Sequence, residues 1–97
     1  MKKRRVLYSA TAKELIKKLP PSIKPSVKEG IDRLSEEPHT GKELIEELSG
    51  FRSLAVGKYR IVYSISGNEA EIEIHSAGHR RDVYMRFREM LGVKSEG

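Results

Sequence analysis

Apolar residues in the first part of the chain change from a short β-forming run to a helical spacing. Residues 3–8 end in three β-formers and predict a strand. The spacing that follows predicts two helices, the first ending at Pro20-Pro21 and the second running from near Ser22 to before Pro38. Because the joining turn is so short, the helices should form an antiparallel hairpin. Their apolar stripes comprise Ala12, Leu15, Ile16 and Leu19, and then Ile23, Val27, Ile31 and Leu34.

Capping residues and prolines mark the ends of these helices. Ser9 or Thr11 can cap the first helix, and Thr11 with Glu14 three residues later fits a capping box. Pro25 is tolerated only in a first helical turn, so the second helix should begin near Ser22. Gly30 in the middle of that helix costs about 1 kcal/mol relative to alanine. Close packing against the first helix would explain its presence.

The second half of the chain changes to an alternating pattern. Three strand-like runs cover residues 51–56, 59–66 and 69–76 and are separated by Gly57-Lys58 and Gly67-Asn68. Both dipeptides suit two-residue hairpin turns, so the runs predict an antiparallel meander. This register places Ala55 opposite Arg60, and Arg60 opposite His75. Residues 38–50 are predicted to be a connection with a short turn at 43–48.

Alternation along the meander predicts one apolar face that packs on the helices and one face open to water or a ligand. A last helix is expected over residues 80–91, with Asp82 as a possible cap and residues 92–97 as a frayed tail. The predicted architecture is α+β in a single domain over residues 1–97: an N-terminal strand, a two-helix antiparallel hairpin, a three-stranded antiparallel meander and a short C-terminal helix. The apolar face carries Leu54, Val56, Tyr59, Ile61, Tyr63, Ile65, Ala70, Ile72 and Ile74, and the open face Ser53, Ala55, Arg60, Val62, Ser64, Glu71, Glu73 and His75.

Composition narrows the class of protein further. The 97 residues are 37% hydrophobic, contain no cysteine, and include no stretch near the ~18 apolar residues of a membrane span. A disulfide scaffold, a thiolate metal site and a transmembrane protein are thereby excluded. With only three histidines in the chain, no metal site and no cofactor are expected. The basic start imitates a signal peptide, but only residues 6–8 supply apolar character, so the expected location is cytoplasmic.

Charge indicates a polyanionic partner. Nineteen Lys and Arg residues against 14 Asp and Glu give a net charge of +5. On the predicted open face Arg60 lies beside His75, and the chain then enters the run Gly78-His79-Arg80-Arg81-Asp82-Val83-Tyr84. A guanidinium, an imidazole and a phenol on one sheet face suit a phosphodiester, since arginine binds phosphate oxygens in a bidentate manner and aromatic rings stack on bases.

Structural roles remain open for each of these residues. Arg60 can pair with Glu71 or Glu73 in solvent, His75 and His79 can be ordinary surface or hydrogen-bonding residues, and Tyr84 can be a core residue of the last helix. By alternation Arg52 falls on the apolar face, where a charged group is not expected. Either a bulge turns its side chain to the other face, or its guanidinium extends past the sheet edge into solvent.

Two sequence blocks carry a family resemblance. Leu48–Tyr63, which contains Gly-Lys-Tyr-Arg-Ile-Val-Tyr, and the later His-Arg-Arg-Asp-Val-Tyr at 79–84 resemble the RelE/ParE superfamily of toxin–antitoxin toxins. The resemblance covers nearly the whole chain. It implies a compact microbial RNase-like α+β fold with the helical hairpin on one face of a mainly antiparallel sheet.

The RelE branch implies a ribosome-dependent endoribonuclease that inhibits translation by cutting mRNA codons in the ribosomal A site. The ribose 2′-hydroxyl attacks, and no metal is needed. By this resemblance Arg60 and Arg80 would stabilise the transition state and Tyr84 would stack on a base and help protonate the leaving oxygen. His75 or His79 is the better base on chemistry alone. Binding of RNA would involve Arg52, Lys58 and Arg81.

One position departs from the branch pattern. Related sequences often carry a second basic residue where this chain has Ala55. Two alternatives follow: a ParE-like inhibitor of DNA gyrase, or a catalytically weakened relative that binds RNA or an antitoxin. The implied partners are a cognate antitoxin, ribosomal RNA and mRNA, with neither a membrane nor a small-molecule cofactor. The antitoxin would bind the helical hairpin and the C-terminal helix.

Overall fold

A five-stranded mixed sheet forms the middle of the protein, and elements of unequal size pack on its two faces. The computed structural model describes residues 3–92. The strand order is β1-β5-β4-β3-β2, with β1 parallel to β5 and the other pairs antiparallel. In chain order the elements are β1 (Arg5–Tyr8), α1 (Ala10–Lys17), α2 (Lys24–Glu36), the 3-10 turn η1 (Pro38–Thr40), β2 (Lys42–Glu43), the 3-10 turn η2 (Glu46–Leu48), β3 (Arg52–Val56), β4 (Tyr59–Ile65), β5 (Glu71–His79) and α3 (Val83–Met90).

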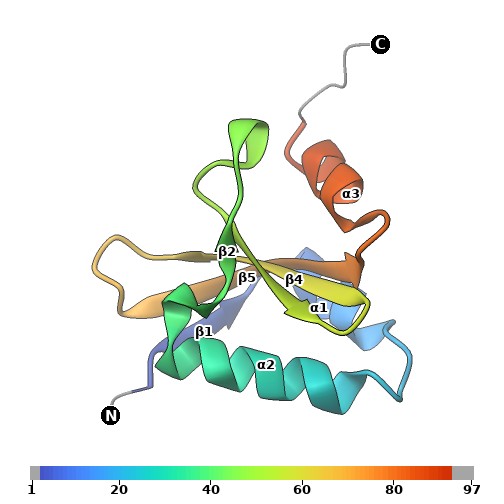
Figure 1. Cartoon of the computed structure of the whole chain (residues 1–97), viewed down its shortest axis with the longest axis horizontal. Coiled ribbons are helices and arrows are strands. Elements are labelled where there is room, and N and C mark those ends of the chain that lie inside the picture. Colours follow the sequence, from blue (N-terminus) through green and yellow to red (C-terminus); the bar gives the residue numbers. More distant parts are fainter. Residues whose placement is uncertain (1–2, 93–97) are drawn as a thin grey trace.

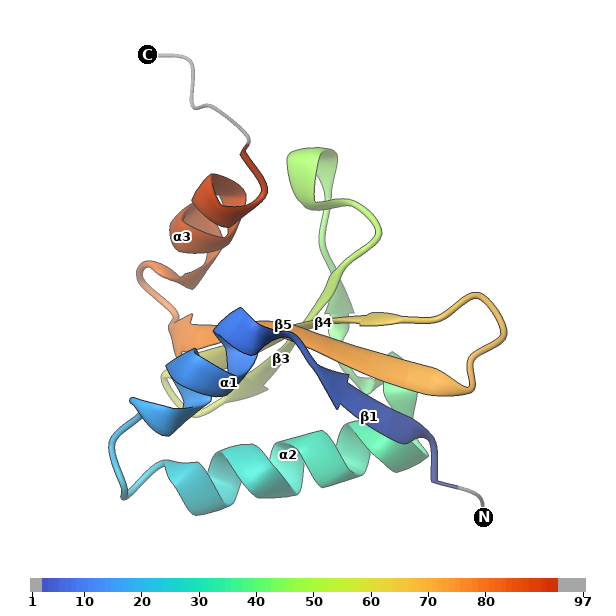
Figure 2. The same ribbon diagram turned by 180° about the vertical axis from the view of Figure 1, so that it is seen from behind.

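Helices α1 and α2 cover one face of the sheet, whereas α3 and η2 rise from the other (Figures 1 and 2). Most of the apolar positions predicted from the alternation pack on the α1/α2 face, but the prediction was wrong for Ala70, which is exposed in the turn between β4 and β5. The α1/α2 face carries the larger core. Its buried members are Ala12, Leu19, Val27, Ile31, Leu34, Leu54, Ile61, Tyr63, Ile72, Ile74 and Ala77. The predicted mixed α+β architecture, with a helical hairpin on one sheet face, is therefore confirmed.

Local sequence explains where the first two helices begin. The Ser9 side chain accepts a hydrogen bond from the Ala12 backbone N–H, so Ser9 rather than Thr11 is the N-cap of α1. Pro25 lies in the first turn of α2, as expected. The explanation offered for Gly30 was wrong: a Cβ there would lie 3.0 Å from Leu54 Cδ2 and 3.2 Å from Val56 Cγ2, so the close approach is to the sheet.

The segment predicted as a connection contains a short edge strand. β2 pairs with β3 in the register Lys42↔Ser53 and Glu43↔Arg52. Tyr63 stabilises the η1 turn that precedes β2, because its hydroxyl donates a hydrogen bond to the Pro38 carbonyl at 2.6 Å and accepts one from the Gly41 N–H at 3.0 Å. A two-residue strand held by side-chain contacts leaves no periodic signal in the sequence.

The β3–β4 hairpin has the predicted register, and the β4–β5 hairpin does not. Val56 pairs with Tyr59, and Gly57 takes a left-handed φ of +59° at the two-residue turn. Arg60, however, lies opposite Gly78 rather than His75. The second turn is wider than two residues, since Glu69 also takes a positive φ of +58° and the next strand pair closes with the Ser66 N–H donating to the Glu71 carbonyl. A β-bulge at Val62/Tyr63 shifts the register once more.

The sheet face predicted to be open is covered over part of its area. A second core lies there between the sheet, η2 and α3. It consists of buried Leu48, Val62, Val83 and Phe87 with Leu44, Phe51 and Tyr84 packed against them. The prediction of a wholly open face was wrong because α3 folds back over β4 and β5.

Two observations concern the limits of the chain and its helices. Of the tail predicted over residues 92–97, only Gly92 lies within the described residues; the rest lies outside them. Among residues 3–92, no helix combines the length and apolar character that crossing a bilayer requires.

Candidate functional site

Three rows of residues cross the sheet on the face that carries α3. In a sheet, residues paired across strands point to the same side. The first row is Ala55, Arg60 and Gly78, and the second row is Ser53, Val62 and Ser76. Ser64 and Glu73 form the third row. Arg60 therefore projects on the face opposite α1 and α2, as the alternation predicted.

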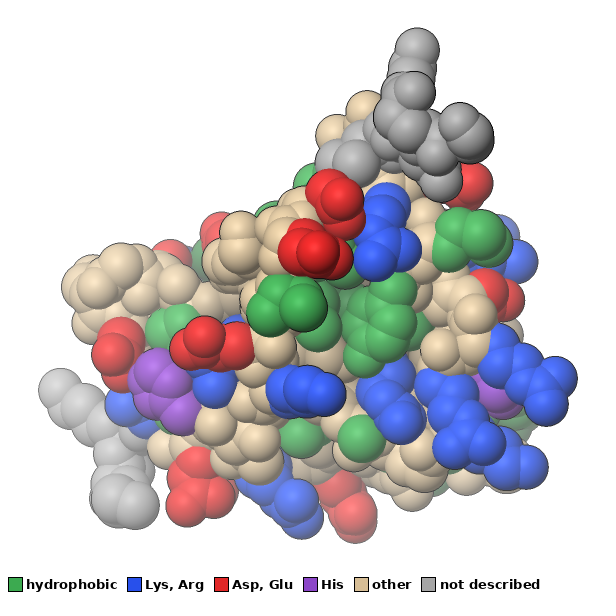
Figure 3. All heavy atoms as spheres, turned by 45° about the horizontal axis from the view of Figure 1, so that its top comes forward, with side chains coloured by type: hydrophobic (Ala, Val, Ile, Leu, Met, Phe, Trp, Pro, Cys, Tyr) green, Lys and Arg blue, Asp and Glu red, His purple; other side chains and the backbone are tan. Residues whose placement is uncertain are grey.

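Four basic residues gather at the end of the sheet where β3 turns into β4. The Arg80 N–H donates to the Lys58 carbonyl at 2.8 Å, which joins the chain leaving β5 to the hairpin tip. The Arg60 guanidinium donates to the carbonyls of Gly57 and Tyr59, both at 2.9 Å. We call Lys58, Arg60, Arg80 and Arg81 the basic end. Figure 3 shows Lys and Arg side chains concentrated on this side of the face.

The basic end is electrostatically uncompensated within residues 3–92. None of its four cations lies within salt-bridge distance of a described carboxylate, whereas Arg86 pairs with Asp82 and Arg88 with Glu47. The pairing of Arg60 with Glu71 or Glu73 that the sequence left open is therefore not formed: Glu71 pairs with Arg5, and Glu73 lies opposite Ser64. Exposed like charges at one end of a surface attract an anion.

Tyr84 connects α3 to the second row. Its hydroxyl oxygen lies 2.8 Å from Ser53 Oγ, and its ring packs against the second core. Val83, one residue earlier, lies over Gly78, where a Cβ would be 3.6 Å from the Val83 Cβ. Tyr84 is thus both a partly buried core residue and a group whose phenol lies one row from Arg60.

His75 is separated from the basic end. The β-bulge places it beside the third row, where its Nε2 lies 2.8 Å from Ser64 Oγ and its ring meets Phe51 edge-on at 5.1 Å. Burial lowers the pKa of His75 from its ordinary value, and the Glu73 carboxylate 3.9 Å away opposes that shift. Burial at this position therefore favours the neutral imidazole.

His79 turns to the other side of the sheet. It pairs with Tyr59, a residue at the margin of the α1/α2 core, and the two rings meet at 5.4 Å. Its Nδ1 accepts a hydrogen bond from the Arg81 N–H at 3.1 Å, which is a structural role in the turn before α3. The ring also lines a cavity of about 670 Å³ between α1 and α3.

Arg52 lies on the α1/α2 face, as the alternation predicted, and its head group reaches the sheet edge. It donates to the Gly41 carbonyl at 2.8 Å and the His39 carbonyl at 3.3 Å, and pairs with Glu43 at 3.2 Å. Its buried Nε has no hydrogen-bond partner in the described part of the chain. These contacts bind the η1–β2 segment to β3 and place Arg52 on the opposite face from Arg60.

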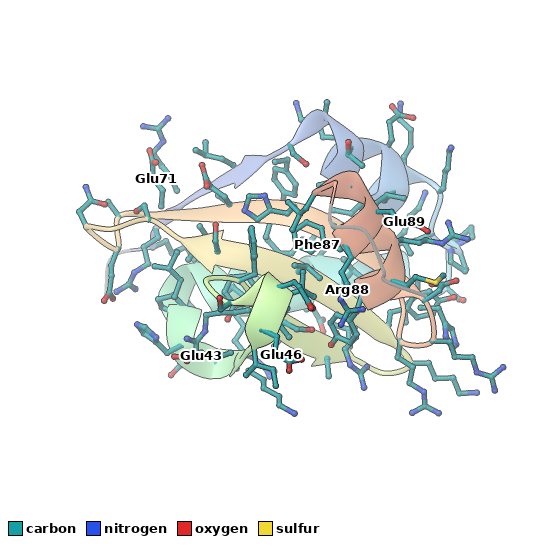
Figure 4. The ribbon with its side chains drawn as sticks, turned by 90° about the horizontal axis from the view of Figure 1, so that it is seen from above. Glu43, Glu46, Glu71, Phe87, Arg88 and Glu89 are labelled. Atoms are coloured by element: carbon teal, nitrogen blue, oxygen red, sulfur yellow. The ribbon has the colours of Figure 1, made fainter. Side chains whose placement is uncertain are left out.

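The basic end and the second core adjoin along α3. Figure 4 shows Phe87 on the inner side of α3 above the sheet and Arg88 on the side toward η2. The arrangement therefore brings together Arg60, Arg80, Lys58, Arg81 and, one row away, Tyr84, but neither predicted histidine. Ser53 belongs to the same site, and the sequence offered only its position on the non-core face as a signal.

Comparisons with known proteins agree on one family. The family model described as ParE toxin of type II toxin-antitoxin system, parDE, matches residues 6–84. Toxin RelG of Mycobacterium tuberculosis is 39% identical over 83 residues, which are 84% of this chain and 95% of RelG.

Solved structures extend this likeness to the fold. The toxin–antitoxin complex RelBE2 from Mycobacterium tuberculosis matches with a TM-score of 0.73 and 36% identity, over 80% of this chain and 99% of the matched chain. A free-state mutant of the Escherichia coli toxin RelE, 14% identical, matches with a TM-score of 0.72 over 97% of this chain and 100% of that one.

Proposed function

The chain belongs to the RelE/ParE superfamily of toxins of type II toxin–antitoxin systems, and we propose that it is a ribosome-dependent endoribonuclease that cuts mRNA in the A site. The observation that carries this proposal is the uncompensated basic end with the Tyr84 phenol one row from Arg60. Because its substrates would be translating ribosomes, the proposed location is the cytoplasm.

The basic end supplies the electrostatic part of the reaction. Attack of a ribose 2′-hydroxyl on the adjacent phosphodiester forms a 2′,3′-cyclic phosphate and releases a 5′-hydroxyl. Negative charge grows on the phosphoryl oxygens in the transition state, where Arg60 and Arg80 would stabilise it. Lys58 and Arg81, both exposed, would hold the flanking phosphates.

Tyr84 is the group proposed to protonate the leaving 5′-oxygen. Neither histidine adjoins Arg60, since His75 lies by the third row and His79 faces the α1 side. We therefore assign the rate enhancement to charge stabilisation and Tyr84 rather than to an imidazole base. The proton of the attacking 2′-hydroxyl passes to solvent water, and Tyr84 recovers a proton from water after the 5′-oxygen has left. Substitution of His75 or His79 by Gln should leave the cutting rate per folded molecule unchanged.

The experiment is cleavage of a defined message on purified ribosomes, read by primer extension and by the chemistry of the new ends. The native chain should cut within the A-site codon and leave a 5′-hydroxyl, and Arg60→Ala and Arg80→Ala should remove the cuts. Arg33→Ala, an exposed arginine on α2, is the matched control. Intact message with the native chain contradicts the proposal.

Inhibition of DNA gyrase is the second candidate function. Two observations favour it. The matched family model describes ParE toxins. In addition, the residue opposite Arg60 is Ala55, at a position where a second cation would strengthen the binding of RNA. A gyrase supercoiling assay separates the two, because inhibition of supercoiling without mRNA cutting supports the ParE-like function. If the native chain neither cuts mRNA nor inhibits supercoiling, the result supports the remaining alternative, a catalytically weakened relative that binds RNA or an antitoxin.

A cognate antitoxin is the proposed protein partner. The matched RelBE2 structure is described as a toxin–antitoxin complex. Here α3 exposes Met85, Met90 and the adjacent Leu91, and an apolar groove between α1 and α3 lies beside Met90. Co-expression with the neighbouring open reading frame should yield a stable complex and restore growth.

A further inference from the structure

Ser53 places a hydroxyl group in the interior of the sheet. It lies between Lys42 of β2 and Val62 of β4 and is only 5% exposed. Serine is not a strand-forming residue by preference, and a buried hydroxyl costs free energy unless it is hydrogen-bonded. The partner present is Tyr84, whose hydroxyl oxygen lies 2.8 Å away.

This hydrogen bond joins two parts of the molecule that are far apart in sequence. Ser53 belongs to β3, whereas Tyr84 is the second residue of α3. A tyrosine ring has two side-chain torsions, so fixing its hydroxyl at one end and its backbone at the other fixes the whole ring. When Ser53 Oγ is the donor, the phenolic proton of Tyr84 is free to point toward a ligand.

The Ser53–Tyr84 hydrogen bond matters for the proposed reaction because it lies close to Arg60. Ser53 lies in the second row and Arg60 in the first, so they are diagonal neighbours on one face, and diagonal neighbours in a sheet are about 7–8 Å apart. At this backbone spacing, one bound phosphodiester would reach both the Arg60 side chain and the Tyr84 phenol. Errors of about 1 Å in such placement cost about a hundredfold in rate.

We propose that Ser53 is a positioning residue that holds the Tyr84 phenol at the scissile phosphodiester. This inference rests on the proposed endoribonuclease function and deepens it. Ser53 acts by fixing the position of Tyr84. The covalent bonds that form and break are those of the substrate, and Tyr84 supplies a proton.

The chain contains a matched control for the loss of a buried hydroxyl. Ser76 lies in the same row, on β5, and is 1% exposed. Among the described residues, the Tyr84 hydroxyl is hydrogen-bonded to Ser53 Oγ and not to Ser76. Ser76→Ala therefore reproduces the removal of a buried serine hydroxyl without touching the proposed contact.

The test measures steady-state cutting of a defined message on purified ribosomes by the full chain. Ser53→Ala should lower kcat about tenfold, the effect of roughly 1.4 kcal/mol, with KM for the programmed ribosome unchanged. Ser53→Thr should restore the rate, and Ser76→Ala should cut normally. In a Tyr84→Phe background, Ser53→Ala should have no additional effect, because the interaction is already absent.

A second measurement reports the contact without activity. With tyrosine labelled at the ring Cζ carbon, the Tyr84 NMR resonance should move in Ser53→Ala and Ser53→Cys but not in Ser76→Ala. Cysteine keeps the side-chain volume and bonds weakly, so it serves if the alanine variant fails to fold. An unmoved resonance, or normal cutting by Ser53→Ala, overturns the inference. Failure of the native chain to cut contradicts the proposed function itself and removes the catalytic role of Ser53 with it.

Discussion

Arg60 and Gly78 lie directly opposite each other in the β4–β5 ladder, at the point where α3 begins to fold back over the sheet. Gly78 leaves the space between Arg60 and α3 without a side chain, and Val83 occupies its outer side. Position 78 therefore has room for a Cβ beneath Val83, but a large side chain there would displace the start of the helix that carries Tyr84.

Substitutions at Gly78 should show how much room this arrangement allows. A Cβ at Gly78 would meet Val83 atoms at 3.6 Å, an ordinary contact, so Gly78→Ala should change the free energy of unfolding by no more than about 0.5 kcal/mol. Gly78→Leu should push α3 outward at a cost of about 1–3 kcal/mol and weaken any activity that needs Tyr84. Urea denaturation measures both variants, and equal stability of the two would contradict the close packing.

Phe87 should hold α3 on the sheet. It is 2% exposed and meets Phe51 edge-on with ring centroids 4.9 Å apart. Phe87→Ala should destabilise the protein by about 3–5 kcal/mol, the usual cost of removing a buried aromatic ring. Hydrogen exchange of α3 amides should accelerate. Met85→Ala, at a 54% exposed position of the same helix, is the control and should have little effect.

Arg52 should act on stability rather than on RNA. Its guanidinium donates to the Gly41 and His39 carbonyls and pairs with Glu43, all on the sheet face opposite Arg60. Arg52→Lys cannot keep this set of contacts and should destabilise the fold by about 1–3 kcal/mol. The cutting rate per folded molecule should stay at the native level. A fall in that rate without a fall in stability would instead place Arg52 at the RNA.

His75 should make folding sensitive to mild acid. Burial lowers its pKa in the folded state, so between that value and about 6.5 the unfolded chain binds more protons than the folded one. The free energy of unfolding should therefore fall as the pH drops below about 6.5 and level off below the folded pKa. His75→Gln should remove this part of the pH dependence. Thermal unfolding between pH 7.5 and 5 measures the difference between the two proteins, and parallel curves would show that His75 titrates normally.

The sequence was sufficient for those elements whose signals are local. The β3–β4 register followed from Gly57 at a two-residue turn, and both helices of the hairpin followed from their apolar stripes and prolines. The placement of Arg60 on the face away from those helices followed from alternation alone.

The remaining features depend on contacts that alternation does not encode. The wider β4–β5 turn is held by the Asn68 side chain, which accepts from the Ala70 N–H and the Ser66 hydroxyl. The bulge beside His75 shifts the β4–β5 register further, so that Arg60 lies opposite Gly78 and not opposite His75 as expected. The second core draws Leu44 and Leu48 from a segment with no periodic pattern, so its cover over the sheet could not be foreseen.

The most direct test of the account is the cutting of one message by the native chain, Arg60→Ala and Arg33→Ala, each at equal folded concentration on purified ribosomes. A-site cuts are expected with the native chain and with Arg33→Ala. Arg60→Ala should lower the cutting rate at least a hundredfold, as expected when a group that stabilises transition-state charge is lost. Cutting by Arg60→Ala at the native rate would contradict the central role of this arginine.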